Sequence, residues 1–183
     1  SYRNSFFNTK NYSTHKKSIA STRAGNVIGG GDWAKDRIIP DIIKALQENK
    51  IITVRNPNAI RPWQHVLEPL GGYLHLGTKM VDEPVKYSDA WNFGPNIEDD
   101  LTVEELVNLA IKYWGAGEYK KPSLSNQPHE AGLLKLDITK AKNELQWEPI
   151  MNAGESIKFT IDWYKEFFEK NDAVNLMKSQ IQK

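Results

Sequence analysis

Short strand-like runs alternate with segments of helical spacing along this chain, and this alternation limits the possible fold more than any other feature. Strands are predicted at Ile19–Ala24, Ile51–Val54 and Ala90–Pro95. Helices are predicted where apolar residues recur on one face: Ile38–Asn49, Val66–Val81, Leu101–Trp114, Asp137–Leu145 and Gly154–Lys170. The alternation predicts an α/β fold with a parallel sheet rather than a helix bundle. Three or four strands are too few for a complete doubly wound sheet.

The composition excludes several classes of function. The 183 residues carry 24 basic and 23 acidic side chains, a balance that argues against a nucleic-acid partner. The absence of cysteine excludes disulfides and thiolate metal sites, and agrees with the reducing cytoplasm. No apolar run approaches the roughly 18 residues of a membrane helix, and the first residues do not form a signal peptide. We expect a cytoplasmic protein with no membrane contact.

The helix boundaries carry recognisable signals. Thr102 with Glu105 three residues later predicts a capping box, and Asp137 is a second candidate cap. Pro40 falls in the first turn of its helix, where a missing N–H costs little. Asn11–Lys17 is predicted to be a polar connection, and residues 171–183 a peripheral tail.

A glycine-rich segment follows the first predicted strand. Gly25–Arg37 is predicted to be a loop, and Gly30 lies in its run of three glycines, which lets backbone approach a ligand closely. Residues 29–34 formally match the dinucleotide pattern G-x-G-x-x-A, but the helix does not open at once and the nearest acid, Glu48, lies on that helix. The segment is either a flexible connector or a substrate loop over a diphosphate, and we favour the second.

Two kinds of side chain near this loop suit a phosphorylated ligand. Asn26 follows the strand directly, so we expect its amide at the carboxyl edge of the sheet, where ligands bind in open α/β folds. A turn-capping asparagine is the alternative. Arg61, placed between Ile60 and Pro62-Trp63, is the strongest single candidate, because its guanidinium fork matches a diphosphate. Arg55, at the end of the strand Ile51–Val54, is a second candidate.

The remaining polar and aromatic residues support weaker hypotheses. We expect His65 to be structural, at the start of a helix, and the histidine spacing predicts no metal site. Trp33, Trp63 and Trp91 could each stack on a base, although core packing is the default for any one of them.

Two segments together, residues 22–33 (TRAGNVIGGGDW) and 55–69 (RNPNAIRPWQHVLEP), resemble the substrate half of the extended short-chain dehydrogenase/reductase family, and its members that act on CDP-glucose in particular. The resemblance covers about residues 18–168. It implies the last part of a Rossmann-type parallel sheet in residues 1–30 and a small mixed α/β substrate-binding domain in residues 31–170.

The same resemblance assigns site residues. It implies that Asn26 contacts the nucleotide-sugar and that Arg61 binds its diphosphate. Asn92 matches the family's Tyr-Asn-x-Gly pattern and is implied to be structural or a distal substrate contact. His129 lies where relatives bind base and ribose.

The implied activity is that of a lyase with tightly held NAD. The family oxidises C4 of the glucose, eliminates water across C5–C6 and returns hydride to C6, giving CDP-4-keto-6-deoxyglucose, a precursor of dideoxy sugars in surface polysaccharide such as O-antigen. The resemblance places the catalytic residues and the NAD fingerprint N-terminal to Ser1, so we expect no catalytic or cofactor-binding residue in this chain, no activity from it alone, and a homodimeric parent. Tyr12 and Lys16 imitate the family's Tyr-x-x-x-Lys pair, but we expect them in a loop.

Two other functions stay open. One is a nucleotide-sugar epimerase or reductase of the same family, which the preferred base would distinguish. The other is a non-catalytic nucleotide-sugar-binding module or an interaction domain, which the presence or absence of coding sequence upstream of Ser1 would distinguish.

Overall fold

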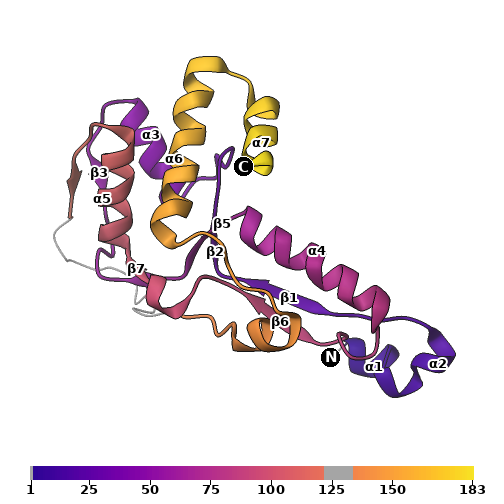
Figure 1. The fold of residues 1–183 in the computed structure, drawn as a ribbon. Coiled ribbons are helices and arrows are strands. Elements are labelled where there is room, and N and C mark those ends of the chain that lie inside the picture. Colours follow the sequence, from indigo (N-terminus) through magenta and orange to yellow (C-terminus); the bar gives the residue numbers. More distant parts are fainter. Residues whose placement is uncertain (1, 122–133) are drawn as a thin grey trace.

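The computed structural model describes residues 2–121 and 134–183, and in them eight short strands form four two-stranded sheets (Figure 1). Three pairs are parallel and one is antiparallel. The parallel pairs are β1 (Ser21–Ala24) with β6 (Ala90–Phe93), β2 (Asn26–Ile28) with β5 (Trp63–His65), and β3 (Ile52–Thr53) with β8 (Tyr119–Lys120). The antiparallel pair is β4 (Ile60–Arg61) with β7 (Leu101–Thr102).

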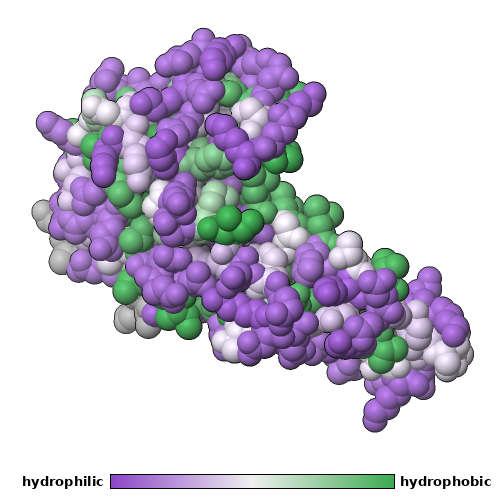
Figure 2. All heavy atoms as spheres, viewed as in Figure 1, coloured by the Kyte–Doolittle hydropathy of each residue, from purple (hydrophilic) through white to green (hydrophobic). Residues whose placement is uncertain are grey.

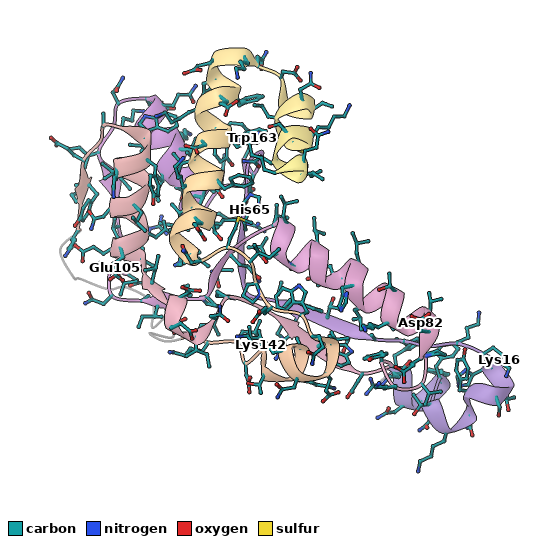
Figure 3. All side chains as sticks on the ribbon, viewed as in Figure 1. Lys16, His65, Asp82, Glu105, Lys142 and Trp163 are labelled. Carbon is teal, nitrogen blue, oxygen red and sulfur yellow. The ribbon has the colours of Figure 1, made fainter. Side chains whose placement is uncertain are left out.

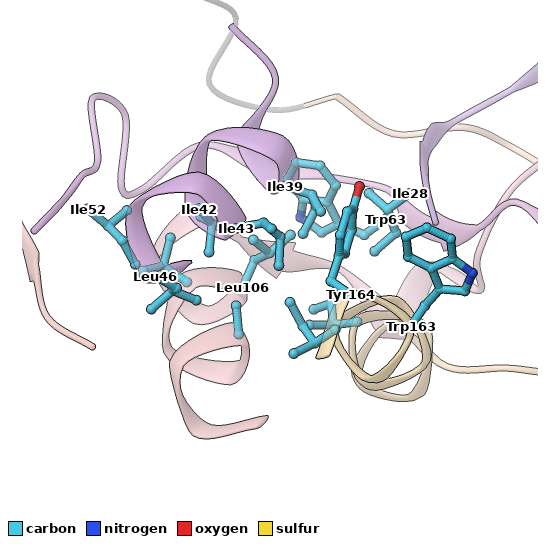
Figure 4. Close-up of a cluster of buried hydrophobic side chains, with 14 of the residues drawn as sticks. Ile28, Ile39, Ile42, Ile43, Leu46, Ile52, Trp63, Leu106, Trp163 and Tyr164 are labelled. Carbon is cyan, nitrogen blue, oxygen red and sulfur yellow. The ribbon is translucent and has the colours of Figure 1, made fainter. Parts of the chain in front are cut away.

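The larger hydrophobic core lies between three helices at one end of the molecule (Figures 1 and 4). These helices are α3 (Ile38–Gln47), α5 (Val103–Trp114) and α6 (Ala153–Lys170). The predicted apolar face of α3 is confirmed: Ile39, Ile42, Ile43 and Leu46 are buried, and Ile38 is partly buried. Each fully buried side chain of this size contributes roughly 1.5–3 kcal/mol, so this face holds α3 in place.

A second core lies under α4 (Leu67–Asp82) and contains Trp91 and Phe93 of β6. Gly72 lets α4 approach β6 closely, since a Cβ there would lie 2.3 Å from Cδ1 of Phe93. The other face of α4 exposes Leu74 and Val81. Figure 2 shows apolar side chains where α4 lies below the helices at the top of the view.

The predicted cap of α5 is confirmed. The Glu105 N–H donates to Oγ1 of Thr102, and the Thr102 N–H donates to the Glu105 carboxylate. Helix α6 begins with the same arrangement between Asn152 and Glu155. None of the helices in residues 2–121 and 134–183 has the length and the hydropathy of a membrane-spanning segment.

One expected loop and one expected helix start are wrong in part, because parallel pairing extends into polar sequence. Residues 25–37 contain β2, which forms because the Gly25 N–H donates to the Phe93 carbonyl and the Asn26 N–H to the Pro62 carbonyl. A Cβ at Gly25 would lie 2.8 Å from the Pro62 oxygen, so only glycine permits this approach. His65 lies in β5 rather than at a helix start.

Three further segments differ from expectation. Residues 9–15 form a 3₁₀ turn (Thr9–Asn11) and α2 (Tyr12–His15), which follow α1 (Tyr2–Phe6). Ala141–Leu145 is a π-helix rather than an α-helix, although Asp137 still accepts a bond from the Thr139 N–H. The expected tail contains α7 (Ala173–Gln182), which is held to α6 by buried Leu176 and by Gln180, whose amide donates to the Phe159 carbonyl.

Candidate functional site

A pocket of about 900 Å³ opens where four parts of the chain meet: β2, the loop of residues 29–37 (the glycine loop), the first turn of α3 and the end of β3. Both polar and apolar side chains line it. The lining residues that carry charge or an amide are Asn26, Asp32, Asp36, Arg37, Asp41, Arg55, Asn56 and Arg61. The site therefore offers three guanidinium groups, which suit an anionic ligand, together with three carboxylates, of Asp32, Asp36 and Asp41, which offset part of that charge.

Three predicted site residues line this pocket together: Asn26, Arg55 and Arg61. Asn26 is the first residue of β2 and is half-buried. Arg61 is only 8% exposed, and its Nη1 donates to the Ile60 carbonyl at 2.9 Å. Arg55 is exposed and lies 3.9 Å from the Asp36 carboxylate. The shielded charge of Arg61 interacts more strongly with an anion than a solvated one does.

The other predicted residues lie elsewhere. Gly30 packs against Trp163, where a Cβ would lie 2.0 Å from the indole ring, and it does not line the pocket. Asn92 donates from Nδ2 to the Asp137 carbonyl at 2.9 Å, also away from the pocket lining. His129 lies outside the described residues. Ligand contacts by these three residues stay predictions.

Arg37 and a helix terminus at the pocket were not predicted from the sequence, and Trp63 was named there only as a possible stacking residue. Arg37 lies 3.4 Å from the Asp32 carboxylate, and both residues line the cavity. Trp63 is buried and lines the pocket, and its Nε1 has no hydrogen-bond partner in the described part of the chain. The first turn of α3 also faces the cavity, and N–H groups at a helix start favour anions. The sequence did carry one signal for Arg37, which is a charged residue directly before a predicted helix.

His65 lies behind the pocket rather than in it. Its ring is 1% exposed, Nδ1 accepts from the Leu67 N–H at 3.4 Å, and the ring packs edge-on against Phe159. Burial lowers the pKa of His65 to about 4, so the ring is neutral near pH 7. Figure 3 places His65 and Trp163 in the same part of the molecule, whereas Lys16 lies at the opposite end.

The glycine run does not fit a dinucleotide cradle. After β2 the chain continues through residues 29–37 before α3 begins at Ile38, and the Trp163 indole fills the space beside Gly30. A dinucleotide site needs a helix that opens directly from the strand. No cluster of three or more metal-ligating side chains occurs in residues 2–121 and 134–183.

The sequence was compared with those of known proteins. No family model matches the sequence. Over 180 residues, 98% of its length, the chain is 46% identical to CDP-glucose 4,6-dehydratase of Salmonella typhimurium. The resemblance to the extended short-chain dehydrogenase/reductase family is confirmed. The match is to the C-terminal half of the Salmonella dehydratase. A dTDP-glucose 4,6-dehydratase of Streptomyces antibioticus is 26% identical over 155 residues. The chain spans about half the length of the curated relatives it matches.

Solved structures confirm the predicted fold class. The dTDP-glucose 4,6-dehydratase of Bacillus anthracis, in complex with NAD, matches 88% of this chain and 49% of its own with a TM-score of 0.66 and 22% identity. The UDP-glucose 4-epimerase of Thermotoga maritima, with UDP-glucose, matches 86% of this chain and 49% of its own with a TM-score of 0.68 and 19% identity. At these identities the likeness establishes the fold of this dehydrogenase/reductase family and nothing finer.

Proposed function

We propose that this chain supplies the nucleotide-sugar site of a CDP-glucose 4,6-dehydratase, an NAD-dependent lyase that converts CDP-glucose to CDP-4-keto-6-deoxyglucose and water. One observation carries the proposal: Asn26, Arg55 and Arg61, chosen from the sequence as ligands of a nucleotide diphosphate, line one pocket. The 46% identity to the Salmonella enzyme supports the choice of CDP-glucose.

The diphosphate is the part of the ligand that this pocket suits best. Arg61 would donate two parallel N–H bonds to phosphate oxygens from a shielded position, which makes each bond stronger than one at a wet surface. The first turn of α3 adds N–H groups and a positive helix end. The Asn26 amide would bond to a phosphate or sugar oxygen. Arg55 and Arg37 would attract the anion from the more exposed rim.

The remaining contacts and the cofactor belong to the whole protein. Gly30 and Asn92 are proposed as a close backbone approach and a distal sugar contact, and His129 as a contact to the base or ribose. NAD would supply the oxidation and reduction. Because the glycine run does not fit a dinucleotide, we assign none of the described residues to NAD. Four further points stay predictions: that the chain divides into two parts near residue 30, that the parent protein is a homodimer, that it is cytoplasmic, and that it acts in surface-polysaccharide biosynthesis.

A nucleotide-sugar epimerase is the second candidate, since epimerases share this fold at comparable TM-scores. The identity to these epimerases is 18–21%, against 46% to the Salmonella dehydratase, so the dehydratase is preferred.

Binding of CDP tests the proposal directly. We expect the full-length protein to bind CDP more tightly than dTDP in isothermal titration calorimetry. Arg61→Ala should weaken CDP binding on the order of 10- to 100-fold, because a charge-assisted bond contributes roughly 1.5–3 kcal/mol. The control is Arg23→Ala, which removes an exposed arginine of β1 outside the pocket lining. Equal losses in the two variants, or no CDP binding by the unmodified protein, would refute the proposal.

A further inference from the structure

The glycine loop that lines the pocket is held from behind by helix α6. The indole of Trp163 fills the space beside Gly30, and the Tyr164 hydroxyl donates to the Asp32 carbonyl at 2.6 Å. The Trp33 ring packs edge-on against Tyr164, with 5.2 Å between ring centroids. Successive residues of the loop, from Gly30 to Trp33, therefore contact two adjacent aromatic residues of α6.

The residue held by Tyr164 connects the loop to a cation in the pocket. Asp32 lines the cavity, and its Oδ1 accepts from the Ala34 N–H at 3.0 Å. Its Oδ2 lies 3.4 Å from Nη1 of Arg37, which also lines the cavity. A short path thus runs from the Tyr164 hydroxyl through the Asp32 backbone and carboxylate to the Arg37 guanidinium.

We infer that Tyr164 is a positioning residue for this pocket: its hydroxyl fixes the backbone at Asp32, and so fixes the loop wall and the place of Arg37. The inference rests on the proposed function for its ligand, but the hold on the loop can be measured without one. No contact between Tyr164 and the substrate is implied, because Tyr164 does not line the pocket.

Burial makes the Tyr164 hydroxyl hard to replace. The Tyr164 side chain is fully buried, and this burial, with the nearby Asp32 charge, raises the pKa of Tyr164 to about 12. The hydroxyl therefore stays protonated, and able to donate, near neutral pH. A phenylalanine ring would pack at this position as well as a tyrosine ring does. What the tyrosine adds is the hydroxyl and its hydrogen bond to the Asp32 carbonyl.

Tyr164→Phe isolates that bond, because the ring and its contacts with Trp33 and Trp163 are kept. The matched control is Tyr73→Phe, which removes a tyrosine hydroxyl from α4, where the ring packs on Phe93 in the second core. Both variants would be made in the full-length protein. Hydrogen exchange of residues 29–37 and calorimetric binding of CDP would be measured for each, with the melting temperature as a check on the fold.

We expect amide exchange in residues 29–37 to become about three- to tenfold faster in Tyr164→Phe, and CDP binding to weaken by a similar factor, as loss of one hydrogen bond allows. Tyr73→Phe should leave both unchanged. Unchanged loop exchange, or faster exchange with unchanged CDP affinity, would overturn the inference. If the unmodified protein does not bind CDP, the proposed function fails instead, and loop exchange still decides whether Tyr164 holds the loop.

Discussion

His65 illustrates how a single residue in this chain combines a titratable group with full burial. It lies in β5 between Gln64 and the start of α4, and its Nε2 has no hydrogen-bond partner among the described residues. Gln64 beside it donates from Nε2 to the Phe93 carbonyl at 2.8 Å, which connects β5 to β6. A neutral imidazole fits this environment, and an imidazolium would be desolvated without a counter-ion.

His65 should therefore make the protein less stable in mild acid. The pKa of His65 is about 4 in the folded protein and near 6.5 when unfolded, so the unfolded state binds the extra proton between these values. The free energy of unfolding should fall as the pH drops from about 6.5 to about 4, by about 3 kcal/mol in total. Urea unfolding across this range measures the change.

His65→Gln should flatten that pH dependence, whatever its effect on stability at neutral pH. The reference is the slope of the unmodified protein, measured over the same pH range. An unchanged slope in His65→Gln would mean that other groups cause the acid sensitivity.

Part of the site was predictable from the sequence, because polar or cationic side chains stood at predicted strand ends or beside a proline. Asn26 stood at a strand end, and Arg55 and Arg61 were cations beside strand and proline signals, and these three line the pocket. Trp63 was expected to pack in a core by default, since nothing in its neighbours distinguishes a buried indole from one that also borders a cavity. Gly30 was chosen for backbone freedom, but its space is filled by a side chain 133 positions later in the sequence, at Trp163.

Helix α4 carries a glycine pair whose two members have different environments. Gly72 is buried against Phe93, whereas Gly71 is exposed and nothing lies within 4 Å of the position a Cβ would take. Gly72→Ala should lower the free energy of unfolding by about 1–3 kcal/mol through overpacking. Gly71→Ala should raise it by about 0.5–1 kcal/mol, because alanine favours the helix. Urea denaturation of both variants checks the opposite signs, and equal shifts would contradict the close packing of α4 on β6.

The cap of α5 gives a second test of a helix. Thr102→Ala removes the side-chain acceptor of the Glu105 N–H and should cost about 1 kcal/mol of stability. Thr78→Ala, which removes an exposed hydroxyl within α4, is the matched control and should cost much less. A thermal unfolding series would measure both. Similar costs for the two substitutions would show that the cap contributes little.

The elements divide into those that the sequence predicted and those that it could not. Helices α3, α5 and α6 were predicted because their apolar residues repeat over several turns. The strands β4, β5 and β8 have two or three residues each, and their partners lie 37 to 67 positions away in sequence. Such strands form only when tertiary structure brings their partners beside them, so local pattern carries no signal for them.

At the scale of the whole molecule, two cores are joined by paired strands. The larger core fixes α3 and α6, which form two walls around the glycine loop, and the smaller core fixes β6 under α4. Gln64 bridges the two strand pairs between them. The pocket lies on the side of the larger core, so the stability of α3 and α6 and the geometry of the pocket depend on the same buried residues.

Turnover would show whether this chain forms the substrate site of a CDP-glucose 4,6-dehydratase. The full-length protein would be incubated with NAD and, separately, with CDP-glucose, dTDP-glucose and UDP-glucose, and loss of one water from each sugar nucleotide would be followed by mass spectrometry. We expect water loss from CDP-glucose with a kcat/KM on the order of tenfold or more above the values for the other two sugar nucleotides. No water loss from CDP-glucose, or a preference for dTDP-glucose or UDP-glucose, would contradict it.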